Sequence, residues 1–173
     1  MNIKDILNAT NGTLINNIIL NENYKQIKIN SKEVKNNDIF IAIVGSSLDG
    51  HNFINEAIDN GAKLIITSKK IKQNIPYIKV KDTTLALGDI AKYMIHKYKP
   101  NVIAITGSVG KTTTRNLIYH LLKTKYNCLT NEKNYNNNIG VPLTIFNLKE
   151  DTEVLIVELG MNHSNEISYL SNM

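Results

Sequence analysis

The chain has 173 residues and is 42% hydrophobic, which suits one globular domain or two small ones and excludes an intrinsically disordered chain. No apolar run is long enough to span a membrane. The net charge of +5 comes almost entirely from lysines scattered along the chain, since Arg115 is the single arginine. A nucleic-acid-binding protein would more often cluster arginine and aromatic residues on one face, so nucleic-acid binding is a minor alternative.

The amino terminus and the cysteine content both favour the cytoplasm. Residues 1–5 lack the apolar core and the small-residue cleavage site of a signal peptide. Cys128 has no second cysteine with which to form a disulfide, and its apolar neighbours favour a buried structural thiol over a nucleophile. We therefore expect a cytoplasmic protein.

Residues 1–81 are predicted to form a small α/β domain. A short helix is expected at residues 1–7, and residues 53–58 have the apolar spacing of a second helix, which Gly61 ends. Buried strands are expected at residues 38–44, 62–67 and 77–80. The order strand, helix, strand predicts parallel strands joined by a right-handed crossover.

A long helix is predicted to link this domain to a second one. Its apolar side chains form one stripe, Thr83 or Thr84 is the expected cap, and Pro100 stops the helix. The linking helix takes up residues 82–100, and the second domain takes up residues 101–173. Within the second domain we expect strands at residues 102–105, 127–129 and 153–159, a helix after the first strand and another at residues 139–148.

Residues 106–113, which read Thr-Gly-Ser-Val-Gly-Lys-Thr-Thr, have the pattern of a phosphate-binding loop between a strand and a helix. Gly107 and Gly110 allow backbone N–H groups to approach phosphate oxygens at the helix amino terminus. Lys111 would lie near the β- and γ-phosphates, and the Thr112 hydroxyl can ligate the Mg²⁺ that accompanies ATP. This spacing indicates a nucleotide site.

The loop departs from the general pattern in one place, because a glycine is usual at position 105 and this chain has Ile105. It is therefore the shorter T-G-S-x-G-K-T form. A plain turn with a surface lysine is the alternative interpretation. The predicted ATP-binding residues are Thr106, Gly107, Ser108, Val109, Gly110, Lys111, Thr112 and Thr113.

Two more segments carry polar residues. Glu158 ends a predicted strand, where ligands bind in open α/β sheets, and its carboxylate could bind Mg²⁺ opposite Thr112. A simple helix cap is the alternative for Glu158. His163 and Glu166 could suggest a metal pair, but the absence of cysteine ligands argues against zinc. Asparagines occur at Asn134, Asn136 and Asn137, where a plain solvated loop is the alternative.

At these segments the chain resembles the Mur ligases. The family motif T-G-S-x-G-K-T-[TS] occurs at residues 106–113, N-x-N-N-x-I-G-V-P-L-T at residues 134–144, and E-L-G-x-N-H-x-x-E-I at residues 158–167. In the first domain, residues 31–34 resemble the D-S-R-x-V segment and residues 49–54 resemble the D-G-H-x-F-I segment of the family. The resemblance covers essentially the whole chain.

The resemblance implies an ATP-dependent amide ligase that adds D-alanyl-D-alanine to UDP-MurNAc-tripeptide through an acyl phosphate in peptidoglycan synthesis, with Mg²⁺. It also implies an α/β fold, with a small N-terminal UDP-sugar-binding domain followed by the first part of a P-loop central domain with a mainly parallel sheet. Lys111 and Glu158 would be catalytic, and Thr112 and Glu158 would hold the metal. Candidate UDP contacts are Ser31, Ser46 and Ser47, and candidate sugar-peptide contacts are Asn134, Asn136 and Asn137.

Two alternatives to an active ligase stay open. The rest of the central domain and the C-terminal domain of the family are expected to be absent, so the chain would be a fragment or a non-catalytic remnant that only binds nucleotide. A small P-loop kinase or switch NTPase is the other alternative. Such proteins usually place an aspartate where this chain has Glu158.

Overall fold

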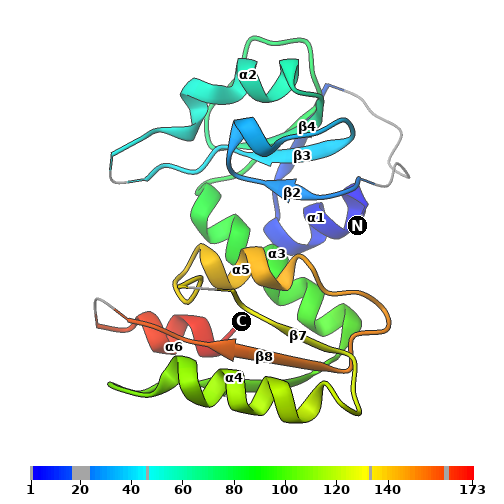
Figure 1. Cartoon of the computed structure of the whole chain (residues 1–173). Coiled ribbons are helices and arrows are strands. Elements are labelled where there is room, and N and C mark those ends of the chain that lie inside the picture. Colours follow the sequence, from blue (N-terminus) through cyan, green and yellow to red (C-terminus); the bar gives the residue numbers. More distant parts are fainter. Residues whose placement is uncertain (1, 17–23, 46, 133, 162–163) are drawn as a thin grey trace. The chain divides into compact units, whose positions relative to one another are not determined.

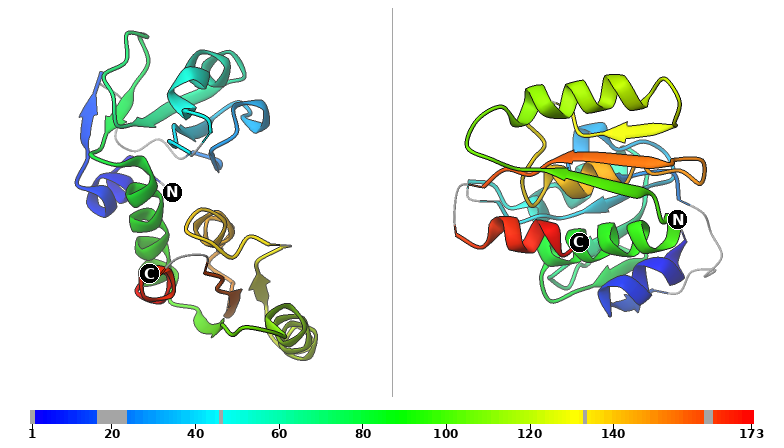
Figure 2. Two further views of the ribbon diagram at one scale, coloured as in Figure 1. Left: turned by 90° about the vertical axis from the view of Figure 1, so that its left-hand side faces the viewer. Right: turned by 90° about the horizontal axis from the view of Figure 1, so that it is seen from below.

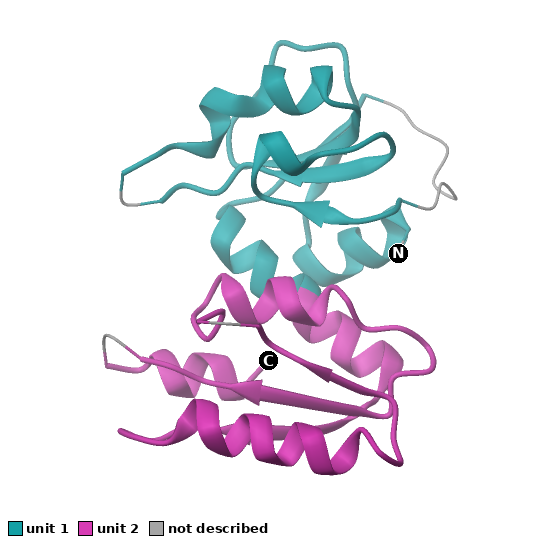
Figure 3. Ribbon diagram, viewed as in Figure 1, with its two compact units in different colours: residues 1–90 teal, residues 91–173 magenta. Residues whose placement is uncertain are grey.

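The computed structural model describes residues 2–16, 24–45, 47–132, 134–161 and 164–173. They form two compact units, residues 1–90 and residues 91–173 (Figure 3). No helix in these ranges is both long and apolar enough to cross a membrane.

The first unit contains a five-stranded sheet with the order β1-β5-β4-β3-β2 (Figure 1). Strands β2 to β5 run parallel, and β1 pairs with β5 antiparallel. The strands are β1 (Thr13–Ile15), β2 (Ile27–Lys28), β3 (Asp38–Ile41), β4 (Ala62–Thr67) and β5 (Tyr77–Lys79). The helices are α1 (Ile3–Thr10), η1 (Ser31–Glu33), η2 (Gly50–Phe53), α2 (Ile54–Asp59) and the start of α3 (Thr83–Tyr98).

The sheet of the first unit is buried on both faces, as is usual for parallel strands between helices. Phe40, Ile65 and Tyr77 of three adjacent strands pack with Ile54 and Ala57 of α2 in one apolar cluster. Alternate residues of the same strands, on the opposite face, are fully buried as well: Ile39, Ile41, Leu64, Ile66 and Ile78. Burial of these side chains fixes the register of the central strands.

Several elements of this unit differ from expectation, and one of them is α1, which covers Ile3–Thr10 instead of residues 1–7. Strand β3 ends at Ile41 instead of residue 44, because the chain turns back there and Gly50 N donates to Ile43 O at 2.8 Å. Asp82, and not Thr83 or Thr84, caps α3, since its Oδ1 accepts hydrogen bonds from the N–H groups of Thr84 and Leu85. Strands β1 and β2 have three and two residues, too few to show a period in the sequence.

The second unit contains a three-stranded parallel sheet with the order β6-β8-β7. Its strands are β6 (Asn101–Ile105), β7 (Cys128–Thr130) and β8 (Val154–Glu158). Figures 1 and 2 show α4 (Lys111–Leu122) along one face of this sheet and α5 (Gly140–Ile145) on the opposite one; α6 (Glu166–Ser171) is the last helix. Every residue of β8 is buried, so this central strand anchors the unit. The predicted α/β fold with a mainly parallel sheet is confirmed.

Burial in the second unit departs from the predicted pattern along α4. The spacing of the apolar residues Leu117, Ile118, Leu121 and Leu122 predicts that they share one buried helix face, but Leu117 and Leu121 are 60% and 72% exposed. The buried residue of this helix is instead Arg115. Helix α5 ends at Ile145, earlier than the predicted residue 148, and the next residues continue in i→i+3 turns. Cys128 is half-buried and unpaired with any other cysteine, and burial raises the pKa of its thiol.

A cluster of polar side chains lies at the carboxyl ends of β3 and β4. Asp49 accepts hydrogen bonds from His51 N and His51 Nδ1, and its other oxygen accepts one from Lys69 Nζ at 2.6 Å. On the far side of the imidazole, His51 Nε2 lies 3.3 Å from Ser68 N. Lys69 and the hydrogen bonds from His51 hold the pKa of Asp49 well below its usual range. The cluster ties the segment after β3 to the segment after β4.

We predict that Asp49→Asn lowers the free energy of unfolding of the 173-residue chain at neutral pH. Because the folded state depresses the pKa of Asp49, this stabilisation is present above the unfolded value of about 4 and is lost as the pH falls towards the folded value. The difference between the two proteins in urea unfolding should therefore shrink between pH 4 and pH 2. Asp59→Asn, which changes an exposed carboxylate, is the control. An Asp49→Asn effect of equal size at pH 7 and pH 2 would contradict this account.

Candidate phosphate-binding site

The predicted phosphate loop connects β6 to α4. Strand β6 pairs in parallel with β8 so that Ile105, the last residue before the loop, lies opposite Glu158. The loop residues are exposed, and Val109 at its tip is 91% exposed. Gly110 precedes the helix with φ of 77°, a left-handed conformation that glycine adopts without strain. The loop therefore brings its backbone N–H groups and the α4 amino terminus to the carboxyl edge of the sheet.

Lys111 is the first residue of α4 and folds back across the loop. Its Nζ donates a hydrogen bond to the carbonyl oxygen of Gly107 at 2.6 Å, so the ammonium group lies beside the loop backbone. The lysine side chain is half-buried. This arrangement puts a positive charge beside the loop and the amino terminus of α4, a combination that suits an anion.

Thr112 and Glu158 lie side by side at the base of the loop. Thr112 Oγ1 donates to Glu158 Oε2 at 2.7 Å, and Glu158 is only 3% exposed. Among the described residues no group of three or more histidine, cysteine, aspartate or glutamate side chains could hold a metal ion. A hydroxyl and one carboxylate are nevertheless the hard oxygen ligands that suit Mg²⁺, which takes few protein ligands when it binds with a phosphate. The residues present fit Mg²⁺ and do not fit zinc.

One of the three predicted asparagines contacts Glu158. Asn136 Nδ2 donates to Glu158 Oε1 at 2.8 Å, and Gly160 N donates to the Asn136 carbonyl at 2.7 Å. A Cβ at Gly160 would lie 2.8 Å from the Asn136 side chain, so a larger residue there would displace the Asn136 carboxamide. Asn137 instead accepts hydrogen bonds at the start of α5 through its Oδ1, and Asn134 is exposed.

The serines predicted to bind UDP lie in the first unit and in different surroundings. Ser31 is buried, and its hydroxyl donates to Glu56 Oε2 at 2.6 Å, a contact that supports the fold. Ser47 is exposed after β3. Ser46 lies outside the described residues, as does His163 of the metal pair considered above.

Sequence reasoning did not identify two residues that contact Glu158. Arg115, one turn after Thr112 on α4, lies with Nη1 3.5 Å from Glu158 Oε2, and both side chains are almost fully buried. Asn131, which follows β7, is 1% exposed and hydrogen bonds to the backbone of Glu158. Arg115 could have been noticed because it is the one arginine of the chain. Asn131 could not, because asparagine is abundant throughout the sequence.

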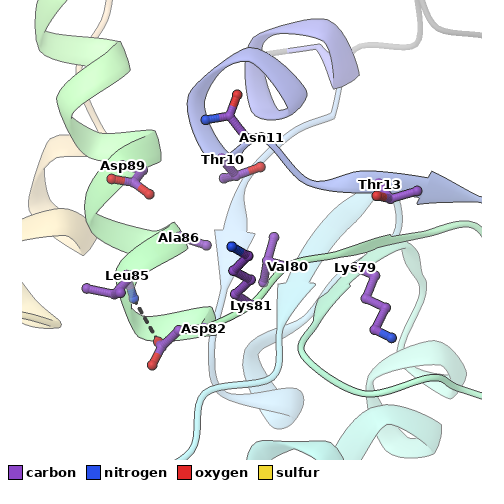
Figure 4. A pocket seen from close by; sticks show the side chains of 10 residues that line it. All are labelled: Thr10, Asn11, Thr13, Lys79, Val80, Lys81, Asp82, Leu85, Ala86 and Asp89. Carbon is purple, nitrogen blue, oxygen red and sulfur yellow. Dashed lines mark hydrogen bonds between the residues drawn. The ribbon is translucent and has the colours of Figure 1, made fainter.

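The first unit has a separate cavity of about 520 Å³, shown in Figure 4. Lys79, Lys81, Asp82 and Asp89 line it together with residues that follow α1, and all four charged side chains are exposed. None of the residues predicted to bind ATP or the substrates lines this cavity.

Comparison with protein families gives two matches that together include most of the chain. The model described as "Mur ligase family, catalytic domain" matches residues 23–95. The model described as "Mur ligase middle domain" matches residues 105–173, which contain the phosphate loop and Glu158.

Curated relatives extend these matches over the whole chain. A UDP-N-acetylmuramoyl-tripeptide–D-alanyl-D-alanine ligase of Buchnera aphidicola is 38% identical over 174 residues, covering 100% of this chain and 37% of the relative. The corresponding ligase of Bacillus subtilis is 32% identical, covering 99% and 38%. The chain thus spans less than two fifths of the length of these relatives.

Solved structures agree with the sequence comparisons. A MurF crystal structure from Acinetobacter baumannii matches with a TM-score of 0.94 and 33% identity, covering 98% of this chain and 38% of that one. A MurF ligase from Thermotoga maritima in complex with ADP matches with a TM-score of 0.77 and 35% identity, covering 84% and 34%. With both units matched in sequence and in structure, the chain belongs to the Mur ligase family.

Proposed function

We propose that this chain is part of an ATP-dependent ligase that joins D-alanyl-D-alanine to UDP-MurNAc-tripeptide in peptidoglycan synthesis. The observation that carries the proposal is the contact between Thr112 and Glu158. It joins the first turn of the helix after the phosphate loop to the end of the neighbouring parallel strand, at the edge where α/β sheets bind ligands. The relatives that bear this activity in their names supply the substrates of the proposal.

The reaction brings anions together, and the residues at the loop suit that problem. A carboxylate oxygen of the tripeptide attacks the γ-phosphorus of ATP, and the bond from that phosphorus to the ADP oxygen breaks. Lys111 and the loop N–H groups would bind the phosphate oxygens on which charge accumulates. When bound, Mg²⁺ supplies further positive charge there, held by Thr112 and Glu158.

The acyl phosphate then reacts with the second substrate. The amine of D-alanyl-D-alanine, after losing its proton, attacks the acyl carbon, and the carbon–oxygen bond to phosphate breaks. The products are the amide, inorganic phosphate and ADP. The amide nitrogen also gives up a proton, so charge and atoms balance.

Substrate contacts complete the proposal. We assign residues 1–81 to binding the UDP-sugar, residues 82–100 to the link and residues 101–173 to ATP. Ser31, Ser46 and Ser47 are the proposed UDP contacts. Asn134, Asn136 and Asn137 are the proposed contacts for the sugar-peptide, and among them Asn136 has the support of its hydrogen bond to Glu158.

In the full-length ligase to which we assign this chain, Lys111→Ala should lower the rate of the ligase reaction by at least about a hundredfold, the scale of losing one electrostatic stabiliser. The measurement is phosphate release with ATP, Mg²⁺, UDP-MurNAc-tripeptide and D-alanyl-D-alanine together. Lys125→Ala, a change to an exposed lysine beyond the end of the same helix, should leave the rate unchanged. A rate near that of the wild type for Lys111→Ala would remove the lysine from the mechanism.

Thr112→Val and Thr112→Ser separate the hydroxyl from the shape of the side chain. If the hydroxyl holds Mg²⁺, valine should reduce the gain in ADP affinity on adding Mg²⁺ by roughly tenfold or more, while serine should retain most of it. Calorimetric titration of the 173-residue chain with ADP, with and without Mg²⁺, measures this gain. Equal behaviour of the two variants would show that the hydroxyl is not a ligand.

A further inference from the structure

Asn131 makes three hydrogen bonds, two to the backbone of Glu158, the candidate metal ligand, and one to the loop beside it. Its Oδ1 accepts from Glu158 N at 2.9 Å, and its Nδ2 donates to Glu158 O at 3.0 Å. The same Nδ2 donates to Tyr135 O at 2.8 Å. Asn131 is 1% exposed, and both the oxygen and the nitrogen of its carboxamide are hydrogen-bonded within the fold.

The Asn131 side chain continues the hydrogen bonding to β8 beyond the last residue of β7. Strand β7 pairs with β8 as far as Thr130 opposite Ile156, and the chain then turns away. Glu158 lies two residues further along β8. Its backbone N–H and C=O groups bond to the side chain of Asn131 in place of the backbone of a neighbouring strand. On its other side, Glu158 lies opposite Ile105 of β6. The end of β8 is thus paired with β6 on one side and hydrogen-bonded to Asn131 on the other.

Asn131 also acts on the carboxylate from a second direction. Through Tyr135 O it holds the loop whose next residue, Asn136, donates to Glu158 Oε1 at 2.8 Å. One buried side chain therefore fixes the backbone of Glu158 and the loop that orients its carboxylate.

We propose that Asn131 is a positioning residue for Glu158 and sets how strongly Mg²⁺ increases nucleotide binding. The proposal deepens the function above and rests on it, because it takes Glu158 as a metal ligand. Groups that orient metal ligands typically contribute ten- to hundredfold to metal affinity or activity. Asn131 touches neither nucleotide nor metal and acts through Glu158.

The chemistry of the site demands an amide of this length. The position needs one acceptor, for Glu158 N, and one donor group shared by two carbonyl oxygens. An aspartate has the same shape but would direct an oxygen at both carbonyls and leave them without a donor. Asn131→Asp is therefore the sharpest substitution.

The test is titration of the 173-residue chain with ADP, with and without Mg²⁺. For Asn131→Asp we expect affinity for metal-free ADP within about twofold of the wild type, and a gain on adding Mg²⁺ that is reduced by about tenfold or more. The matched control is Asn147→Asp, because Asn147 lies in the same unit but is exposed, and its side chain donates to Leu143 O and not to Glu158 or its loop. An undiminished gain in Asn131→Asp would overturn the proposal.

A double-mutant cycle distinguishes the positioning role of Asn131 from metal binding by Glu158. In a Glu158→Gln background, Asn131→Asp should have no further effect on the gain, because its action runs through the Glu158 carboxylate. If Glu158→Gln abolishes the Mg²⁺-dependent increase in ADP affinity but Asn131→Asp leaves it intact, the positioning role of Asn131 is rejected and the metal site is not. A wild-type chain that binds ADP equally with and without Mg²⁺ would reject the metal site, and with it the inference.

Hydrogen exchange on the unaltered chain provides a readout that does not depend on a variant folding or on metal. The Glu158 amide and the side-chain NH₂ protons of Asn131 should exchange slowly, like the core of the sheet, whereas the NH₂ protons of Asn147 should exchange fast. Fast exchange of the Asn131 protons would overturn the proposal.

Discussion

The arrangement of the second unit depends on the burial of Glu158. This residue is 3% exposed and lies at the end of β8, a strand that is buried throughout. Burying such a group is costly unless donors surround it. Thr112 supplies one from the first turn of α4, Asn136 supplies another from the loop before α5, and Arg115 lies 3.5 Å away. Helix α4 and the loop before α5, which are both distant from β8 in sequence, therefore have to meet at Glu158.

The same constraint explains local features that otherwise look unrelated. Arg115 is buried on a helix where Leu117 and Leu121 are exposed, and its place beside the Glu158 carboxylate explains this burial. The absence of room for a Cβ at Gly160 follows from the path of the loop, which brings Asn136 against the chain just after β8. In the first unit, Asp49 gathers donors from the segments after β3 and β4 in a comparable way.

The sequence was most informative where one local pattern determines one element. Strand β4 occupies the predicted residues 62–67, and the glycine spacing at 106–113 predicted a strand-loop-helix that the structure contains. The polar network was harder to predict, because its members come from separate segments and have no common period. Asn131 shows the difficulty most clearly, since nothing in its neighbours distinguishes it from the exposed Asn134. The length of β3 also escaped prediction, because apolar residues continue past Ile41 after the strand itself has ended.

The central claim is that nucleotide binds at the loop between β6 and α4, next to Glu158. Amide chemical shifts of the isotope-labelled 173-residue chain, recorded before and after addition of ADP with Mg²⁺, test it most directly. The account predicts that the largest changes fall on residues 107–113 and on Glu158, and that the cavity of the first unit is unaffected. Changes centred on the first unit, or none at saturating nucleotide, would contradict it.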